Sequence, residues 1–414
     1  MPGTAKVNKV SLQEVILFSL DRDPSVSQQA AQIGISQAQA EEARSAWMPQ
    51  LSLNGSAGQS KTADSNGSLN KSASWGVTLT QLVYDFGKTN NAIAQQEAQR
   101  DSYRFQLMAT LTSVAEKSAQ AFIEIKRYSE LVAAAQASIS ELEKVQRMAR
   151  LRAEAGLNSR SDELQTQTRI SGLRASQQQY AAALQSAKAR LTVISGIVAD
   201  RYEALPELRQ IQHDGLDAID YSAIPAVLAA RSMEKAAQYR TAQAKAQHWP
   251  TISVKGGRTR YESDDRARWD DQIQLSLDMP VYQGGAVSAR VQQAEGGRLL
   301  AASQREQAKF DVLQKASVAK ADWQGAVGRV ASGQAQLESA QHTRQVYKNE
   351  YTLGKRSLND LLSVEQDVWQ ALSSKIMAEY DSRAAVITYE AAIDNLLPAM
   401  GIAKKRLAEL PELN

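Results

Sequence analysis

Two short segments of the chain carry the same three residue types at the same spacing. Gly156, Ser159 and Asp162 in the first segment correspond to glycine, serine and aspartate at positions 354, 357 and 360. Glycine is favoured where a helix ends in the left-handed conformation, and a carboxylate is stabilised in the first turn of the helix that follows. The spacing therefore predicts two helix–turn–helix connections in which Asp162 and Asp360 cap a helix.

Residue types that support catalysis or tight ligand binding are scarce. The chain has no cysteine and three widely separated histidines, so we expect no disulfide, no thiolate metal site and no catalytic constellation. The glycine pairs at 284–285 and 296–297 lack the lysine of a phosphate-binding loop, and acidic pairs such as Asp264-Asp265 are typical of loop tips. We therefore expect no enzymatic activity and no cofactor.

Composition and charge favour long helices and argue against nucleic acid as a partner. Of the 414 residues, 43% are hydrophobic but only 6% are aromatic, and long stretches are rich in Ala, Gln and Ser. The net charge of +3 is spread along the chain. Neither a signal peptide nor a run of about 18 apolar residues occurs, so we expect no transmembrane helix and, for an exported protein, a signal already removed.

Apolar residues at alternating spacings of four and three predict long coiled-coil helices. Residues 88–153 contain neither proline nor glycine, and their seam includes Leu107, Leu111 and Val114. This helix would be about 100 Å long. A second long helix is expected at 286–351, and helices of about half that length are expected at 11–46, after 159, up to 247 and at 359–397.

The periodicity changes to two at residues 50–84 and 251–282, which predicts a β-hairpin in each segment. In the second hairpin, Ile273, Leu275 and Leu277 alternate with polar residues. Such strands belong either to a half-buried sheet of a soluble protein or to a barrel with lipid outside and water inside. Four strands have no separate core to cover and cannot close alone, so a barrel would need several chains.

Six aromatic residues are expected near the ends of these strands. Aromatic side chains gather at membrane–water interfaces, and packing where strands meet helices is the competing interpretation. The six residues are Trp47, Trp75, Tyr84, Trp249, Trp269 and Tyr282.

The order of elements occurs twice along the chain. Trp47 and Pro49 correspond to Trp249 and Pro250, each just before a hairpin, and the period is about 200 residues. We expect a first repeat at 11–200 and a second at 215–400, each with a half-length helix, a hairpin, a long helix and another half-length helix. Segments 197–223 and 398–414 follow neither periodicity and are expected to be irregular.

This duplicated order resembles the TolC family of outer-membrane efflux and secretion proteins over residues 11–400. Residues 79–87, LTQLVYDFG, resemble the family's strand-to-helix segment, and residues 279–285, MPVYQGG, are the second copy. The resemblance implies a mixed α+β membrane protein. It would be a homotrimer in which four strands per chain form a 12-stranded transmembrane β-barrel, continuing into a long periplasmic α-helical barrel of coiled coils belted by the irregular segments.

The resemblance also implies a cellular location and partners. It implies the outer membrane of a Gram-negative bacterium, contact with outer-membrane lipid, a periplasmic adaptor (membrane fusion) protein and an inner-membrane ABC or proton-driven transporter. The chain would then be an exit duct that passively conducts cargo. The segment 84–87, YDFG, resembles secretion-type members, which favours type I protein secretion. A drug or metal efflux pump is one alternative, and a soluble coiled-coil scaffold or a periplasmic adaptor is another.

Both helix turns have implied roles in such a duct. Asp360, repeated around a threefold axis, would form an acidic constriction at the periplasmic entrance with Asp162 in the companion turn, and Arg356 and Tyr351 would tie neighbouring helices shut. Some members carry a second aspartate where this chain has Ser363, so the ring is expected to be less acidic. Adaptor docking is implied for the turn residues Gly156, Leu157, Ser159, Gly354, Lys355 and Ser357.

Overall fold

The computed structural model describes residues 5–60, 70–207, 211, 219–263 and 266–402, and it divides the chain into two compact units. Unit 1 comprises Met1–Gln28, Met108–Ile224 and Phe310–Asn414, and unit 2 comprises Gln29–Leu107 and Pro225–Lys309. Each unit therefore combines segments from both predicted repeats. Such a division is expected when long helices from the two halves of the sequence pack side by side.

Two very long helices dominate the secondary structure. Helix α3 spans Lys88–Glu154 and helix α6 spans Ala286–Thr352, each 67 residues long. The predicted seam of α3 is buried at Leu107, Leu111 and Val114. Ala316, Ala319 and Ala326 on α6 are also almost inaccessible to solvent. Small residues on α6 allow its neighbours to approach closely.

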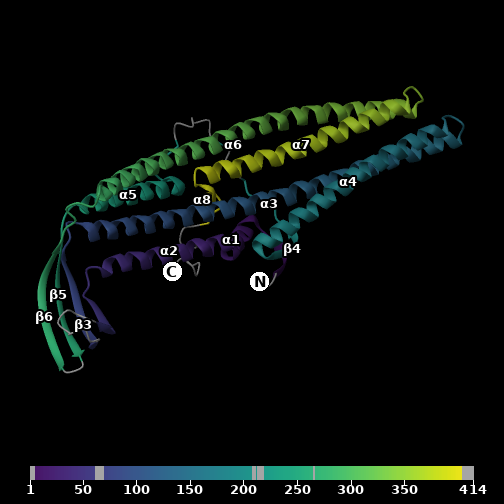
Figure 1. Cartoon of the computed structure of the whole chain (residues 1–414). Helices are drawn as coiled ribbons and strands as arrows, with labels where there is room; N and C mark the ends of the chain where they lie inside the picture. The colour runs from purple at the N-terminus through teal and green to yellow at the C-terminus, as the bar shows by residue number, and fades with distance from the viewer. Residues whose placement is uncertain (1–4, 61–69, 208–210, 212–218, 264–265, 403–414) are drawn as a thin grey trace. The chain divides into compact units, whose positions relative to one another are not determined.

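Unit 1 contains two antiparallel helix pairs, each closed by a short turn (Figure 1). Helix α4, Arg160–Ser195, returns along α3. Gln177 of α4 is hydrogen-bonded to Gln136 of α3, and Arg174 of α4 to Glu143 of α3. Helix α7, Leu358–Ala392, returns along α6 and is followed by the short helix α8, Leu396–Ala399. The predicted final helix at 359–397 is thus interrupted, with Asp394 in the left-handed conformation.

Unit 2 contains a four-stranded antiparallel sheet in the order β2-β3-β5-β6 (Figure 1). Its strands are β2, Gln50–Ser60; β3, Asn70–Tyr84; β5, Thr251–Ser263; and β6, Arg266–Asp278. Helix α5, Pro225–Ala246, leads into β5. The two predicted hairpins pair with each other through β3 and β5, which leaves β2 and β6 with one neighbour each among the described strands.

A second, small sheet pairs β1, Ala5–Val10, with β4, Ile197–Tyr202, in parallel. The prediction of an irregular segment at 197–223 is therefore wrong for its first residues, because β4 begins directly after Gly196 ends α4 in the left-handed conformation. Of the other predicted irregular segment, 398–414, residues 403–414 lie outside the described residues, and Ile402 is buried.

The predicted helix at 11–46 is two helices, α1, Leu12–Arg22, and α2, Pro24–Ser45. The break falls at Asp23, whose backbone is extended (φ −67°, ψ 121°), because a residue before proline is driven out of the helical region. The Asp23 carboxylate accepts a hydrogen bond from the backbone nitrogen of Ser25 at 2.8 Å and so caps α2.

None of the helices in the described ranges combines the length and the mean hydropathy that crossing a membrane requires.

Candidate functional site

The two helix turns of unit 1 share one backbone design. Gly156 and Gly354 both adopt left-handed conformations, with φ of 74° and 73°. In each turn the residue after the glycine donates a backbone hydrogen bond to a carbonyl five residues earlier, at 2.9 Å for Leu157 and 2.8 Å for Lys355. This is the glycine-terminated end that the spacing predicts.

A serine begins the helix that follows each turn. Ser357 accepts a hydrogen bond from the backbone nitrogen of Asp360 at 3.2 Å, and Ser159 accepts one from the backbone nitrogen of Ser161 at 3.3 Å. Asp162 and Asp360 both lie in the first turn of their helices, where the helix dipole favours a carboxylate. The serines are therefore the helix caps, and the two aspartates lie in the first turn without capping it.

Tyr351 joins the two turns. Its side chain is 1% exposed and packs among apolar residues of α3, α4 and α7, including Ile139, Ile170 and Leu361. The amide nitrogen of Asn158 donates to the Tyr351 hydroxyl at 3.0 Å and to a carboxylate oxygen of Asp162 at 2.8 Å. Burial raises the pKa of Tyr351, and the nearby Asp162 charge raises it further.

Arg152, in the last turn of α3, adds two more contacts between the turns. Its Nη1 donates to the backbone oxygen of Thr352 at 3.0 Å, and its guanidinium lies 5.1 Å from the centre of the Tyr351 ring. The first contact satisfies a carbonyl that the end of α6 leaves unpaired. Sequence reasoning missed Arg152, although a cation in the last turn of a helix is the kind of residue that binds such carbonyls.

Arg356 makes its contacts within the α6–α7 pair. Its Nε donates to Glu350 at 2.8 Å, its Nη1 lies 3.9 Å from Asp360, and its guanidinium covers the Tyr347 ring at 4.2 Å. Glu350 holds the pKa of Arg356 above its ordinary value. The structure therefore links Tyr351 to Asp162 through Asn158, whereas the contacts of Arg356 with described residues stay within the α6–α7 pair.

The six residues expected at a docking tip are all exposed on the two turns: Gly156, Leu157, Ser159, Gly354, Lys355 and Ser357. Two leucines at the turns are exposed to water, Leu157 by 66% and Leu353 by 70%. The tips thus present apolar side chains on a rigid, capped frame.

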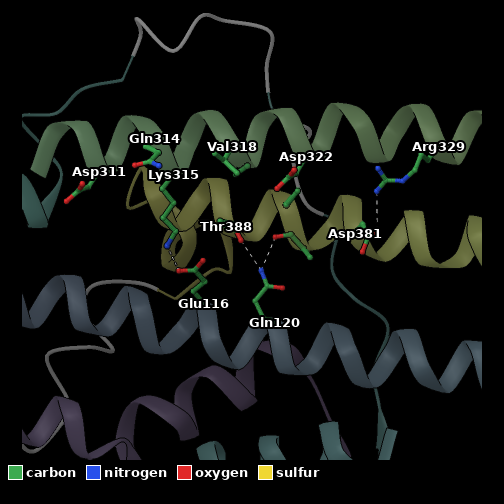
Figure 2. Close-up of a pocket in the computed structure, with 13 residues that line it drawn as sticks. Glu116, Gln120, Asp311, Gln314, Lys315, Val318, Asp322, Arg329, Asp381 and Thr388 are labelled. Carbon is green, nitrogen blue, oxygen red and sulfur yellow. Dashed lines mark hydrogen bonds and ion pairs between the residues drawn. The ribbon is translucent and has the colours of Figure 1, made fainter. Parts of the chain in front are cut away.

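Unit 1 also has a polar groove between α3, α6 and α7 that was not expected from the sequence (Figure 2). It encloses about 770 Å³. Lys315 is paired with Glu116 at 2.5 Å, Arg329 with Asp381 at 3.2 Å, and Gln120 donates to Thr388 at 3.1 Å (Figure 2). These links join the three helices across the groove by polar contacts. Among the described residues, no group of acidic and histidine side chains is arranged to hold a metal.

The sheet of unit 2 has one apolar and one polar face. Residues directly opposite one another on paired strands share a face. The register therefore groups Leu53 with Val77 and Leu51 with Leu79, and all four are exposed. Ser56 and Ser74 are paired on the opposite face and hydrogen-bonded at 2.8 Å.

The sheet is hollowed toward its hairpin turns. A cavity of about 580 Å³ there is lined by residues of both hairpins, among them the polar-face residues Ser56, Ser74 and Tyr261. Gly76 lies where β3 and β5 come together, and a Cβ there would lie 2.7 Å from the backbone oxygen of Arg258. Glycine at such a close approach lets a sheet curve.

The aromatic residues fall into two sets at different levels of the sheet. One set lies where the strands join the helices: Tyr84 meets Phe86 at 4.7 Å, Phe86 stacks on Trp249 at 5.6 Å, and Trp47 donates to Asn90 at 3.1 Å. Tyr282, after β6, is 86% exposed.

The second set is a T-shaped pair, Trp75 and Trp269, with ring centres 5.3 Å apart. Both lie several residues inside their strands rather than at the ends. Phe86 was missed as a member of the first set. The signal for it was that Phe86 occupies the position of Gly284 in the second copy. Both residues adopt a left-handed backbone conformation, which is unusual for phenylalanine.

Long capped helix pairs joined to a two-hairpin sheet define the class of outer-membrane channel chains, and three comparisons support this class. Residues 17–197 and 223–394 match the family described as outer membrane efflux protein. The chain is 21% identical over 393 residues to the outer membrane efflux protein BepC of Brucella suis, covering 92% of this chain and 85% of BepC. It is 22% identical over 385 residues to the outer membrane protein TolC of Escherichia coli, covering 86% and 76%.

Solved structures agree on the fold. The outer-membrane channel OprN superposes with a TM-score of 0.83 at 17% identity, over 93% of this chain and 90% of OprN. The outer membrane protein VceC of Vibrio cholerae superposes with a TM-score of 0.79 at 18% identity, over 94% and 96%.

The chain belongs to the outer membrane efflux protein family, that of the TolC-type channels. The resemblance found in the sequence is thereby confirmed. Members of this family are channels of the Gram-negative outer membrane with a periplasmic tunnel, and they work with adaptors and inner-membrane transporters in tripartite systems. The mixed composition of long helices and sheets is confirmed as well.

Proposed function

We propose that three copies of this chain form one channel, the exit duct of a tripartite export system. The sheet of unit 2 carries this proposal. It has an exposed apolar face, a polar face, and two edge strands, β2 and β6, with one neighbour each among the described strands. Backbone groups at a sheet edge cannot remain unpaired in lipid, so both edges need partners from other copies.

Closure by three copies is consistent with the strand directions. Successive strands in the order β2-β3-β5-β6 alternate in direction, so β2 and β6 are antiparallel to each other. The β6 strand of one copy can therefore pair antiparallel with β2 of the next. Three sheets of four strands give a 12-stranded β-barrel with its polar face around water and its apolar face toward outer-membrane lipid.

In this assembly the aromatic residues are membrane anchors. Trp47, Tyr84, Trp249 and Tyr282 lie at the helix side of the sheet, the periplasmic interface, and Trp75 and Trp269 lie toward the hairpin turns, the outer interface. Aromatic girdles at both interfaces are typical of transmembrane barrels.

The helix turns form the periplasmic entrance in this proposal. Asp360 and Asp162 supply the acidic lining, Tyr351 and Asn158 fasten the two turns of each chain to each other, and Arg356 stiffens its own turn. The exposed leucines and glycines of the tips are the docking surface for a periplasmic adaptor protein. The duct conducts cargo passively and catalyses no reaction.

The preferred transporter is an ABC exporter of type I protein secretion, because residues 84–87 resemble secretion-type members. A drug or metal efflux pump is the second candidate, favoured by the family description and by the efflux protein BepC. Expression in a strain that lacks its own duct separates them. Restored export of a large repeat-rich protein supports secretion, and restored drug or metal resistance alone overturns it.

The absence of cysteine makes assembly testable by disulfide trapping. One cysteine replaces Asn54 in β2, and a second replaces Gln272, Gln274 or Ser276 in β6, each a polar-face position. We expect covalent trimers in one of the three pairs and only monomers in the single-cysteine controls. Failure of every pair, together with a monomeric mass in detergent, would contradict the proposed barrel and support a soluble scaffold.

A further inference from the structure

Two arginines lie on the apolar face of the sheet. In the register, Arg258 is opposite Val77 and Asp271, and Arg260 is opposite Trp75 and Trp269. Opposed residues share a face, so both guanidinium groups belong to the face that carries the exposed leucines. Charged side chains on such a face need a partner wherever lipid is the neighbour.

Both arginines are held from one side only. Arg258 uses its Nε to contact Asp271 at 3.2 Å, and Arg260 uses its Nε to contact Glu262 at 2.6 Å. The terminal nitrogens of both side chains have no hydrogen-bond partner among the described residues. A guanidinium presents its two terminal nitrogens as a fork that fits the oxygens of a phosphate.

An aromatic platform supports the pair. The Arg258 and Arg260 guanidinium groups lie 4.7 Å and 5.5 Å from the centre of the Trp269 ring. The Arg258 side chain is 61% and the Arg260 side chain 35% exposed, so the open forks face outward from the sheet. A flat ring and two cations form a surface suited to a lipid whose headgroup is anionic and whose chains lie along the leucines.

The position of Trp269 and the two arginines along the strands fits that of a lipid headgroup. Along β6, the distance from Leu277 to Trp269 is about 27 Å at 3.3 to 3.4 Å per residue, which approaches the height of about 25 Å of an apolar barrel band once strand tilt is included. In the proposed channel this places Trp269 and Arg260 at the outer border of that band. Arg258 is opposite Asp271, two residues nearer to Leu277, and its guanidinium reaches to the Trp269 ring. Pairing of β6 with another copy would cover the strand edge but not this face.

We infer that Arg258 and Arg260, on the Trp269 platform, bind a phosphate group of an outer-leaflet lipid with a phosphorylated headgroup. This inference rests on the proposed channel. Asp271 and Glu262 hold the Nε edges and thereby keep the two forks turned outward. The result is a site that fixes lipid around the barrel at the level of the outer headgroups.

The test measures lipid retained by the assembled protein. The protein is reconstituted in phosphatidylcholine nanodiscs that contain diphosphorylated lipid A, then transferred to detergent, and bound lipid is counted by native mass spectrometry. In the double variant R258Q/R260Q we expect retention to fall about tenfold or more. The matched control is R266Q/R268Q on β6, because these arginines oppose Ser263 and Tyr261 on the polar face.

The outcomes are distinct. Equal retention by R258Q/R260Q and the unaltered protein, or equal retention of dephosphorylated lipid A, overturns the phosphate site. Conductance of the same preparations in planar bilayers tests the channel separately. An R258Q/R260Q trimer that conducts normally shows that its lipid result does not come from misfolding, whereas absence of any conducting trimer in the unaltered protein would refute the proposed function itself.

Discussion

Tyr351→Phe is the sharpest test of the proposed gate. The substitution removes only the hydroxyl that accepts a hydrogen bond from Asn158 at 3.0 Å. The ring stays in its 1% exposed place in the core and keeps its contact with the Arg152 guanidinium. The variant should therefore fold normally and lose one link between the two turns of each chain.

The expected effect follows from the strength of one neutral hydrogen bond. Such a bond contributes about 1 kcal/mol. Asn158 keeps its bond to Asp162 and is only partly buried, so water can bind the N–H that loses the Tyr351 hydroxyl. If the three copies open together, the closed state loses about 3 kcal/mol in total. At about 1.4 kcal/mol per factor of ten, the ratio of closed to open channels should fall about 100-fold.

Single-channel recording in planar bilayers measures this ratio. Tyr351→Phe should raise the open probability and the mean conductance at neutral pH. Tyr347→Phe is the matched control, because it removes a hydroxyl in the neighbouring turn of α6 for which no hydrogen bond to the described residues exists. Conductance in Tyr351→Phe equal to that of the control would refute the role of this link in closure.

Three further substitutions probe the frame around these sites. Gly76→Ala should abolish the detergent-stable oligomer seen by size-exclusion chromatography, because its Cβ would lie 2.7 Å from a β5 backbone oxygen, whereas Gly58→Ala, with no atom within 4 Å, should assemble normally; equal assembly would contradict the curvature argument. Gly354→Ala forces alanine to a φ of 73° and should lower stability by about 1 to 2 kcal/mol, seen as a lower thermal midpoint in circular dichroism; an unchanged midpoint would show that the turn relaxes. Burial raises the pKa of Glu365, so the folded protein binds this proton more tightly than the unfolded chain does. The carboxyl therefore costs stability as pH rises above its unfolded pKa of 4.5. Glu365→Gln should raise the thermal midpoint near about pH 7 and leave it unchanged near about pH 4; a gain of equal size at both would show that ionisation is not the cause.

Periodicity predicted the elements that carry their own signal. The helix expected at 88–153 is found at Lys88–Glu154, because nothing within it breaks a helix and Gly156 ends it. The two hairpins were visible because apolar and polar residues alternate in their strands, as at Ile273, Leu275 and Leu277 in β6. Local residue types are sufficient to predict an element wherever one residue pattern fixes one backbone conformation.

Contacts between distant segments were not predictable in this way. The parallel pair of β1 and β4 depends on two six-residue strands that meet across most of the first half of the chain. Arg152 and Asn158 were missed as partners of Tyr351 because their role exists only when two turns of the same unit lie side by side. The spacing of residues within either turn carries no information about the contact between the two turns.

The two turns show how duplication and divergence divide the work. In both turns the glycine ends one helix, the serine caps the next and the aspartate lies in its first turn, so the frame is shared. At neighbouring positions, Arg152 and Asn158 of the first turn correspond to Glu350 and Arg356 of the second. Both pairs are bonded within their own turn, Arg356 to Glu350 at 2.8 Å and Arg152 to Asn158 at 3.4 Å, but the first-turn pair also reaches across to Tyr351 and Thr352. Two turns with identical side chains would bring like charges together. Divergence at these few positions therefore allows one turn to bind the other, while the inherited caps hold both turns.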